Sequence, residues 1–307
     1  MTASRLEPQT LATPSGEPPR VILPARTTVF ADRARRFAAL SAGHALGDWL
    51  AFLGHLTAAQ QSALDNFPAV PLPDASALTR CREHGMPPLP AQSWPRAPAW
   101  RAALAVFGEH LLPHAPPAAA DTLRSLAAAT PEAVEALADR VLRTELYGEQ
   151  ADRLPFVAAA LQVYWTHLAA SLGAAGVPAL DVPGVCPCCG FLPVGSVVRA
   201  GGEVANLRYL HCALCNAEWN LVRVKCAACD ANEKVSYRQI EGGDGAVRAE
   251  TCDDCHAYLK IFYQEKSRDL DPVADDLATL ALDILVDEAG YTRAGPNLLL
   301  VPGNATN

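Results

Sequence analysis

The sequence predicts an α+β protein with an N-terminal all-α helical domain, two tandem four-cysteine knuckle modules and a C-terminal helix. Up to about residue 172, alanine and leucine recur at the three- and four-residue spacing of amphipathic helices. Beyond that point, short apolar runs alternate with glycine-rich turns, which is typical of β-hairpins. Nine of the ten cysteines lie between Cys186 and Cys255, so one region of the chain carries the distinctive chemistry.

The predicted organisation has five parts. Residues 1–28 are rich in Pro, Ser, Thr and Arg without a sustained period, which indicates an irregular arm. The composition changes near residue 180, and we place the main domain boundary there. The parts are the arm (1–28), the helical domain (29–180), the first module (181–225), the second module (226–268), and the C-terminal helix and tail (269–307).

Within the helical domain, residues 31–66 are predicted to form one long helix or two, because Gly43 and Gly54 interrupt the pattern. Residues 68–98 are rich in proline and are predicted to form an extended connector, since proline lacks the N–H that propagates a helix. Thr130 and Pro131 supply a cap and a first-turn proline to one of the helices that follow. Four further helices are predicted, at residues 99–113, 118–128, 132–147 and 155–172.

The cysteine-rich half is predicted to contain six strands. Residues 194–199 and 204–210 flank one glycine-rich turn, and residues 235–240 and 246–251 flank another, so each pair is expected to form a hairpin. Two additional strands are predicted at residues 219–225 and 258–263.

The last predicted element is a single helix over residues 272–289, with Asp271 as its N-cap and Pro272 at its first position. We expect one apolar face, formed by Val273, Leu277, Leu280 and Ile284. The four aspartates of this segment are interpreted as a helix cap and a solvated face rather than a catalytic group: Asp275, Asp276, Asp283 and Asp287.

Four C-x-x-C pairs carry the main functional signal: Cys186/Cys189, Cys212/Cys215, Cys226/Cys229 and Cys252/Cys255. A tight turn with this spacing directs two thiolates at one ion, and two such turns complete a tetrahedron. Adding forty to each position of the first two pairs gives the positions of the last two, so the segment is an internal duplication. The duplication favours two metal ions, with the first pair joined to the second and the third to the fourth, over an interleaved arrangement.

The residue after the second cysteine of each pair supports the knuckle interpretation. It is Gly190, Asn216, Asp230 or His256, which are types that tolerate a positive φ. Disulfides are disfavoured, because they belong mainly to exported proteins and the first thirty residues contain no apolar stretch typical of a signal peptide. The spacing suits rubredoxin-like or zinc-ribbon modules, and it does not distinguish iron from zinc.

Other interpretations of these residues are weaker. The stretch 252–256 matches the C-x-x-C-H haem-attachment pattern, but it is also the fourth copy of the knuckle. Thioredoxin-like chemistry would need a βαβ pattern that this segment lacks. Cys81 and Cys188 are interpreted as incidental thiols, and His211 as a core or surface histidine rather than a ligand. Because four cysteines fill each tetrahedron, no open position remains for a substrate, and no catalytic residue is predicted.

Composition excludes further classes. The chain has 307 residues, a formal net charge of -8 and a pI near 5.5, which argues against a nucleic-acid partner. The most apolar run, residues 277–286, is interrupted by Thr279 and Asp283 and is shorter than the roughly 20 residues that a membrane span needs. A protein without membrane insertion is therefore expected.

The cysteine-rich half closely resembles the FdhE family of formate dehydrogenase accessory proteins, over residues of about 180 to 300. The motifs that carry the resemblance are Cys186-Pro187 with Cys189-Gly190, Leu207-Arg208-Tyr209-Leu210-His211-Cys212, Glu218-Trp219, Val222-Arg223-Val224-Lys225-Cys226, Glu250-Thr251-Cys252, Tyr258-Leu259-Lys260-Ile261, Gln264-Glu265-Lys266, Ala274-Asp275-Asp276-Leu277-Ala278 and Gly290-Tyr291.

The resemblance implies a cytoplasmic, non-catalytic accessory protein needed for the formation of active respiratory formate dehydrogenase. It further implies binding to the catalytic subunit of that enzyme before export, and rubredoxin-type iron in preference to zinc. We expect the helical and knuckle domains to form a concave surface for that subunit. Two alternatives from other classes are a rubredoxin-like electron carrier and a zinc-ribbon nucleic-acid adaptor.

Overall fold

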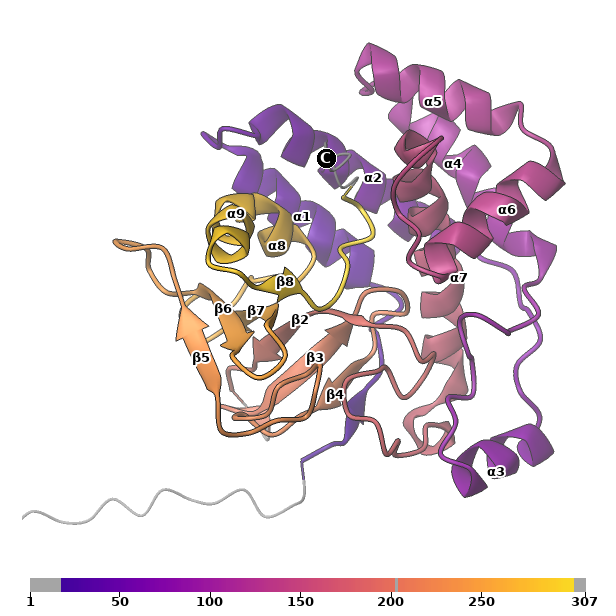
Figure 1. Cartoon of the computed structure of the whole chain (residues 1–307). Helices are drawn as coiled ribbons and strands as arrows, with labels where there is room; N and C mark the ends of the chain where they lie inside the picture. The colour runs from indigo at the N-terminus through magenta and orange to yellow at the C-terminus, as the bar shows by residue number, and fades with distance from the viewer. Residues whose placement is uncertain (1–17, 202–203, 301–307) are drawn as a thin grey trace, which may run out of the picture.

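The computed structural model describes residues 18–201 and 204–300 (Figure 1). An N-terminal helical region packs beside a region built on one sheet, and the chain ends in helices above that sheet, which confirms the predicted fold class. Residues 1–17 of the predicted arm, residues 202–203 of the first hairpin turn and residues 301–307 of the tail lie outside the described residues.

The helical region follows the predicted order. Residues 31–66 form two helices, because a turn at Gly43, which has a φ of +72°, separates them. The later helices begin within three residues of their predicted starts, although α6 ends at Leu142 and not at residue 147. The elements are α1 (Val29–Ser41), α2 (Gly47–Asp65), α3 (Ala75–Glu83), η1 (Pro98–Arg101), α4 (Ala102–Leu111), α5 (Pro117–Ala127), α6 (Pro131–Leu142), η2 (Ala151–Arg153), α7 (Leu154–Leu172) and η3 (Ala174–Gly176).

The connector prediction was wrong for one stretch. Residues 68–98 contain helix α3, which begins after Asp74, and the Asp74 carboxylate accepts a hydrogen bond of 2.7 Å from the backbone N–H of Ala77. No proline lies between Pro73 and Pro87, so the residues of this stretch can form a helix.

Helix α7 is the centre of the packing. Residues 154–169 are all buried, since the helix contacts other helices on one side and the cysteine-rich region on the other. A helix that is apolar all round needs such cover on every face. Its position places the end of the helical region directly against the first knuckles.

The strands form one sheet in the order β1-β4-β3-β2-β7-β6-β5, with β8 paired to β7. Both predicted hairpins are present, as the antiparallel pairs β2–β3 and β5–β6. β3 starts four residues later than predicted, and β4 ends at Asn220 rather than near residue 225. The strands are β1 (Val21–Ile22), β2 (Pro193–Val198), β3 (Arg208–Cys212), β4 (Glu218–Asn220), β5 (Val235–Arg238), β6 (Val247–Cys252), β7 (Ala257–Tyr263) and β8 (Thr292–Arg293).

A parallel pairing between β2 and β7 joins the two modules into this single sheet. Gly195 in β2 permits the close approach, because a Cβ at this position would lie 2.6 Å from the ring of Phe262 in β7. At the far edge, β1 comes from the segment predicted as an irregular arm and pairs with β4. The modules therefore share backbone hydrogen bonds with each other and with the start of the described chain.

The predicted C-terminal helix is two helices, α8 (Ala274–Ala278) and α9 (Leu280–Glu288), with a break at Thr279. Asp271 caps the first as expected, because its carboxylate accepts from the backbone N–H groups of Val273 and Ala274. The buried ammonium group of Lys260 donates to the backbone carbonyls of Asp276 and Thr279 at this break. Of the expected apolar face, Val273 and Leu277 are buried and Leu280 packs against the same core.

Two parts of the C-terminal prediction were therefore wrong. Ile284 is 61% exposed rather than packed. Asp275 and Asp276 are buried, because Asp275 pairs with Arg36 of α1 and Asp276 pairs with Lys260 and Arg293. Burial alone raises the pKa of Asp276, but the charges of Arg293 and Lys260 outweigh it and lower that pKa. A helical repeat cannot reveal such partners, since they come from distant segments.

Arg33 joins three parts of the chain. Its guanidinium is fully buried and donates to the carboxylate of Asp271 at 2.9 and 3.1 Å, ahead of α8. It also donates to the side-chain oxygen of Asn216, in the second knuckle, at 2.9 Å. This one buried guanidinium therefore links helix α1, the first cysteine module and the C-terminal helices.

We predict that Arg33→Gln lowers the free energy of unfolding by about 3 to 5 kcal/mol, because it leaves the Asp271 carboxylate without its buried partner. The matched control is Arg35→Gln on the same helix, where the arginine is 72% exposed and pairs with Asp32. That change should cost less than about 1 kcal/mol. Urea denaturation followed by circular dichroism measures both, and equal losses would contradict the role assigned to Arg33.

Candidate metal centres

The structure brings the eight cysteines of the C-x-x-C pairs together in two groups of four. Within each group, the Sγ atoms all lie within 4.8 Å of one another. The first group is Cys186, Cys189, Cys212 and Cys215, and the second is Cys226, Cys229, Cys252 and Cys255. This grouping is the predicted one, and the interleaved arrangement is not seen.

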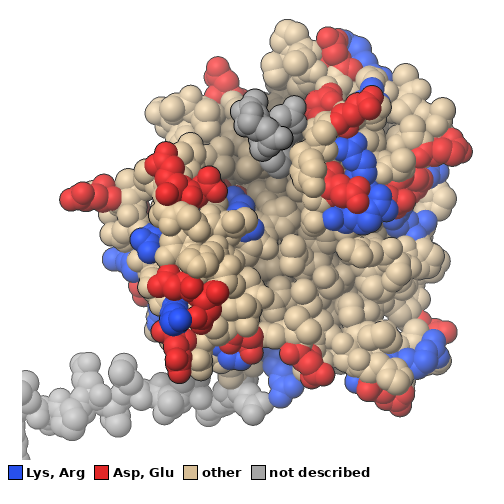
Figure 2. Space-filling view, viewed as in Figure 1, with Lys and Arg blue, Asp and Glu red and all other residues tan. Residues whose placement is uncertain are grey.

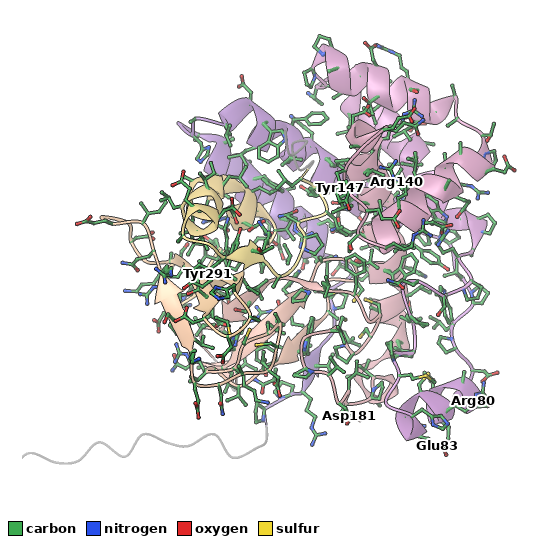
Figure 3. All side chains as sticks on the ribbon, viewed as in Figure 1. Arg80, Glu83, Arg140, Tyr147, Asp181 and Tyr291 are labelled. Atoms are coloured by element: carbon green, nitrogen blue, oxygen red, sulfur yellow. The ribbon has the colours of Figure 1, made fainter. Side chains whose placement is uncertain are left out.

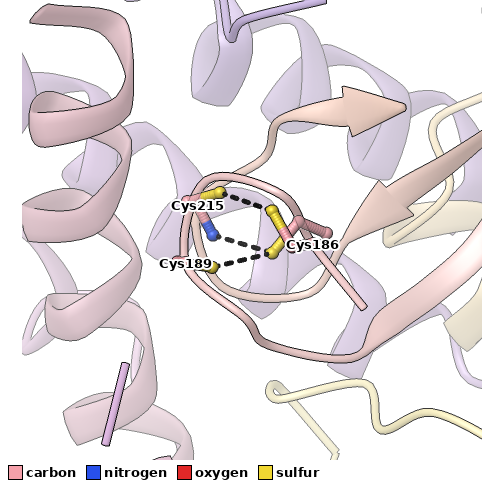
Figure 4. Close-up of side chains that lie close together, drawn as sticks. Cys186, Cys189 and Cys215 are labelled. Atoms are coloured by element: carbon pink, nitrogen blue, oxygen red, sulfur yellow. Dashed lines mark hydrogen bonds between the residues drawn. The ribbon is translucent and has the colours of Figure 1, made fainter. Parts of the chain in front are cut away.

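The sulfur spacing fits a central ion. The Sγ–Sγ distances are 3.5 Å for Cys186–Cys215 and for Cys189–Cys212, and 3.7 Å for the corresponding pairs of the second group. Sulfurs at about 2.3 Å from one tetrahedral ion would be about 3.8 Å apart, whereas a disulfide is about 2.05 Å long. Figure 4 shows Cys186, Cys189 and Cys215 pointing toward one another. Each group can therefore hold one metal ion.

The knuckle turns have the backbone geometry that the sequence predicts. The residue after each second cysteine has a positive φ, and the values are 70° for Gly190, 58° for Asn216, 64° for Asp230 and 54° for His256. Backbone N–H groups also point at the sulfurs, since those of Leu214 and Cys215 donate to the Sγ of Cys212 at 3.4 Å. These donors stabilise thiolate charge.

The first group is fully enclosed, with every cysteine 0% exposed. Helix α7 covers one side, where Gln162 donates to the carbonyl of Ala213 at 2.7 Å and Asn216 donates to the hydroxyl of Thr166 at 2.8 Å. The proline-rich connector covers another side, because the N–H groups of Leu89 and Ala91 donate to the carbonyls of Cys188 and Cys189. This site is built into the contact between the two regions.

The donor chemistry of the first group suits a cation. Burial raises the pKa of Cys189 and of Cys215. Burial also acts against ionisation of Cys186, but hydrogen bonds from the neighbouring thiols outweigh it and lower the pKa of Cys186. One thiolate is thus stabilised by its neighbours, whereas four buried thiolates at this spacing need a metal ion.

The histidine and the two extra cysteines lie outside the cysteine groups. His211 has both ring nitrogens occupied, with Nδ1 at 3.0 Å from Glu218 and Nε2 at 3.2 Å from Asn216. Cys188 is buried, and its pKa is raised chiefly by its hydrogen bond to Cys186. Cys81 is half-buried in α3.

The second group differs from the first in its exposure. Cys226 and Cys252 are buried, at 5% and 1%, but Cys229 and Cys255 are exposed. Burial raises the pKa of Cys226 to about 12. We did not predict this asymmetry, although one signal was available: the residues between the cysteines are Ala213 and Leu214 in one copy and two aspartates in the other.

We predict that Cys189→Ser and Cys229→Ser, which occupy equivalent positions of the duplication, have different effects. All five tryptophans lie at or before Trp219, so their fluorescence reports only the helical region and the first module. In urea, Cys189→Ser should lower the stability of that signal by about 3 kcal/mol or more, because the lost site lies inside the packing. Cys229→Ser should change it by less than about 1 kcal/mol.

Native mass spectrometry provides the control, since each variant should retain one bound ion. Equal shifts of the fluorescence transition in the two variants would contradict the structural difference between the sites.

No helix among the described residues combines the length and apolar character that crossing a membrane requires.

Comparison with known proteins identifies the relatives of this chain. Three family models match it in order: "FdhE, N-terminal" over residues 18–180, "FdhE, central domain" over 185–223, and "FdhE, C-terminal domain" over 224–300. A protein named FdhE homolog from Edwardsiella ictaluri is 42% identical over 284 residues, covering 92% of each chain. Another of that name from Pseudomonas aeruginosa is 39% identical over 310 residues, covering 99% of each.

A solved structure supports the same relationship. The crystal structure of the FdhE protein from Pseudomonas aeruginosa matches with a TM-score of 0.80 and 39% identity, and the match covers 94% of this chain and 100% of that one. The family models, the relatives and the solved structure all extend over both the helical and the cysteine-rich regions. The chain belongs to the FdhE family.

Proposed function

We propose that the protein is a non-catalytic accessory factor that binds the catalytic subunit of respiratory formate dehydrogenase in the cytoplasm and is needed to form the active enzyme. Membership of the FdhE family supports this proposal. The observation that carries it is the pair of all-cysteine groups, because four sulfurs around each ion leave no position for a substrate. Such sites organise a protein or carry electrons.

We propose that the eight cysteines bind two metal ions, one in each group, and that iron is favoured over zinc. The spacing of the sulfurs suits both metals. A bound ion would hold the knuckles folded, and iron would in addition supply one-electron chemistry. The first group joins the helical region to the sheet. An ion bound there would therefore fix how the two regions are arranged at the surface that a partner binds.

A surface suited to a large partner lies between the two regions. Figure 3 places Tyr147, Asp181 and Tyr291 around it. Figure 2 shows that the face between them is hollowed and carries few Lys, Arg, Asp or Glu side chains. Tyr147 is 66% exposed at its upper margin. Interface centres are depleted in charged residues, so this weakly charged face suits the proposed subunit.

A second candidate function is electron transfer at the second group. Its exposed Cys229 and Cys255 would place an ion close to the surface, as an electron carrier needs. The first group, with all four cysteines enclosed, offers no such access.

Elemental analysis with a visible spectrum should give two ions per chain in protein purified without oxidation. Rubredoxin-type iron would make the protein red when oxidised and would bleach on reduction, whereas zinc would leave it colourless. Fewer than one ion per chain, or sulfurs bonded to each other, would contradict the proposed sites. If the bound iron cannot be reversibly reduced and reoxidised, the electron-carrier function is excluded.

A pull-down from formate-grown cells with the tagged protein should recover the catalytic subunit of formate dehydrogenase. We expect Tyr147→Glu to reduce the recovery by about tenfold, because it removes an exposed aromatic ring at the margin of the weakly charged face. Leu46→Glu is the control, since Leu46 is 40% exposed in the loop between α1 and α2. Recovery of no subunit by the unmodified protein would contradict the proposed function.

A further inference from the structure

The two cysteine modules are copies of each other, yet among the described residues an extended segment forms backbone hydrogen bonds along the knuckle of the first copy and not along that of the second. An extended proline-rich segment runs along the first knuckle, where the N–H of Leu89 donates to the carbonyl of Cys188 at 2.9 Å and the N–H of Ala91 to that of Cys189 at 2.8 Å. The indole N–H of Trp165 holds this segment in place by donating to the carbonyl of Leu89. The first copy therefore shows how an extended segment can cover a knuckle of this type.

The same acceptor groups are open on the second knuckle. Forty residues after Cys188 and Cys189 stand Ala228 and Cys229, which are both exposed. No N–H or side chain of any described residue donates to their carbonyls. The carbonyl of Ala213 accepts from Gln162, whereas that of its counterpart Asp253 receives no bond from the described part of the chain. Three acceptors that receive bonds from the connector and α7 in the first copy therefore have no donor among the described residues in the second.

The charges around the open knuckle indicate what would cover it. Asp230, Asp253 and Asp254 are exposed there. Lys225 and Lys234 pair with two of them in exposed salt bridges, which contribute little and are readily exchanged. A divalent ion with four thiolates adds about two excess negative charges. The surface favours a positively charged occupant.

One difference between the copies sharpens this preference. Pro87 packs so closely on the first knuckle that a Cβ on Gly190 would lie 3.2 Å from its ring. The counterpart of Gly190 is Asp230, which is exposed and brings a carboxylate to this knuckle. A basic side chain is favoured over proline at the corresponding position of the occupant, because it can pair with this carboxylate.

We propose that the second knuckle binds an extended, basic segment of a partner polypeptide. Two backbone N–H groups of the segment, two residues apart, donate to the carbonyls of Ala228 and Cys229, as Leu89 and Ala91 do in the first copy. A Lys or Arg two residues before the first of them meets Asp230. The identity of the partner rests on the proposed function, in which it is the catalytic subunit of formate dehydrogenase.

The position of the knuckle supports the same partner. Asp253 accepts a hydrogen bond of 2.6 Å from the hydroxyl of Tyr291. Tyr291 marks one margin of the uncharged face (Figure 3). A subunit on that face is therefore within reach of the second knuckle and can extend a segment onto it.

The test measures the dissociation constant of the purified catalytic subunit for the metal-loaded full chain and its variants. Ala228→Arg places a long cationic side chain on the acceptor groups and should weaken binding by at least about tenfold. Asp230→Asn keeps a residue that tolerates positive φ but removes the charge, so it should weaken binding about threefold and reduce the salt dependence. Asp121→Arg is the control, because Asp121 is 77% exposed on α5 in the helical region.

Native mass spectrometry must show two ions in each variant, so that a change in binding cannot come from loss of metal. If the unmodified chain binds the subunit and both Ala228→Arg and Asp230→Asn bind it as tightly, the second knuckle is not the contact and the proposed function stands. If the unmodified chain does not bind the subunit, both proposals are overturned. Weaker binding by the two knuckle variants, with an unchanged Asp121→Arg, supports the inference.

Discussion

The buried guanidinium of Arg33 fixes the arrangement on which the rest of the structure depends. It lies between Asn216, which follows the last cysteine of the first group, and Asp271, which caps the first C-terminal helix. Neither contact survives if helix α1 moves, since a buried charge must keep its partners. This junction ties helix α1 to the second knuckle and to the start of the C-terminal helices, while α7 and the connector enclose the first cysteine group.

The duplicated modules use their equivalent positions differently. Asn216 takes part in bonds to Arg33 and Thr166, whereas its counterpart His256 is exposed and lies 6.0 Å from the ring of Tyr291. The parallel pairing of β2 with β7 keeps both modules in one sheet, and α9 packs on the strands of the second, although its knuckle lacks the cover that α7 and the connector give to the first. One copy joins the parts of the molecule, and the other presents its knuckle to the surroundings.

This division is consistent with an accessory protein. The enclosed cysteine group lies at the contact between the two regions, and the second group has exposed aspartates around it and carbonyls that accept no bond from the described residues. A binding surface that combines a weakly charged centre with a polar margin matches the general organisation of protein interfaces. Function would then reside in the shape of the whole face rather than in a single reactive group.

Local patterns in the sequence were sufficient to predict the helices around α7, both hairpins and the grouping of the eight cysteines. Each of these depends on residues near one another in the chain, or on a repeat of forty positions. Helix α3 was missed because the prolines on either side of it dominated the interpretation of residues 68–98.

The tertiary structure alone decided which polar groups are buried. Asp275 and Asp276 look like a solvated helix start, yet their partners Arg36 and Lys260 come from α1 and β7. Lys260 also donates to the backbone carbonyls of Asp276 and Thr279, at the break between α8 and α9. The cover of one knuckle and not the other also depends on contacts between distant segments. Spacing along the chain specifies the ligands of an ion, but burial depends on what packs against them, and that is set only when the whole chain has folded.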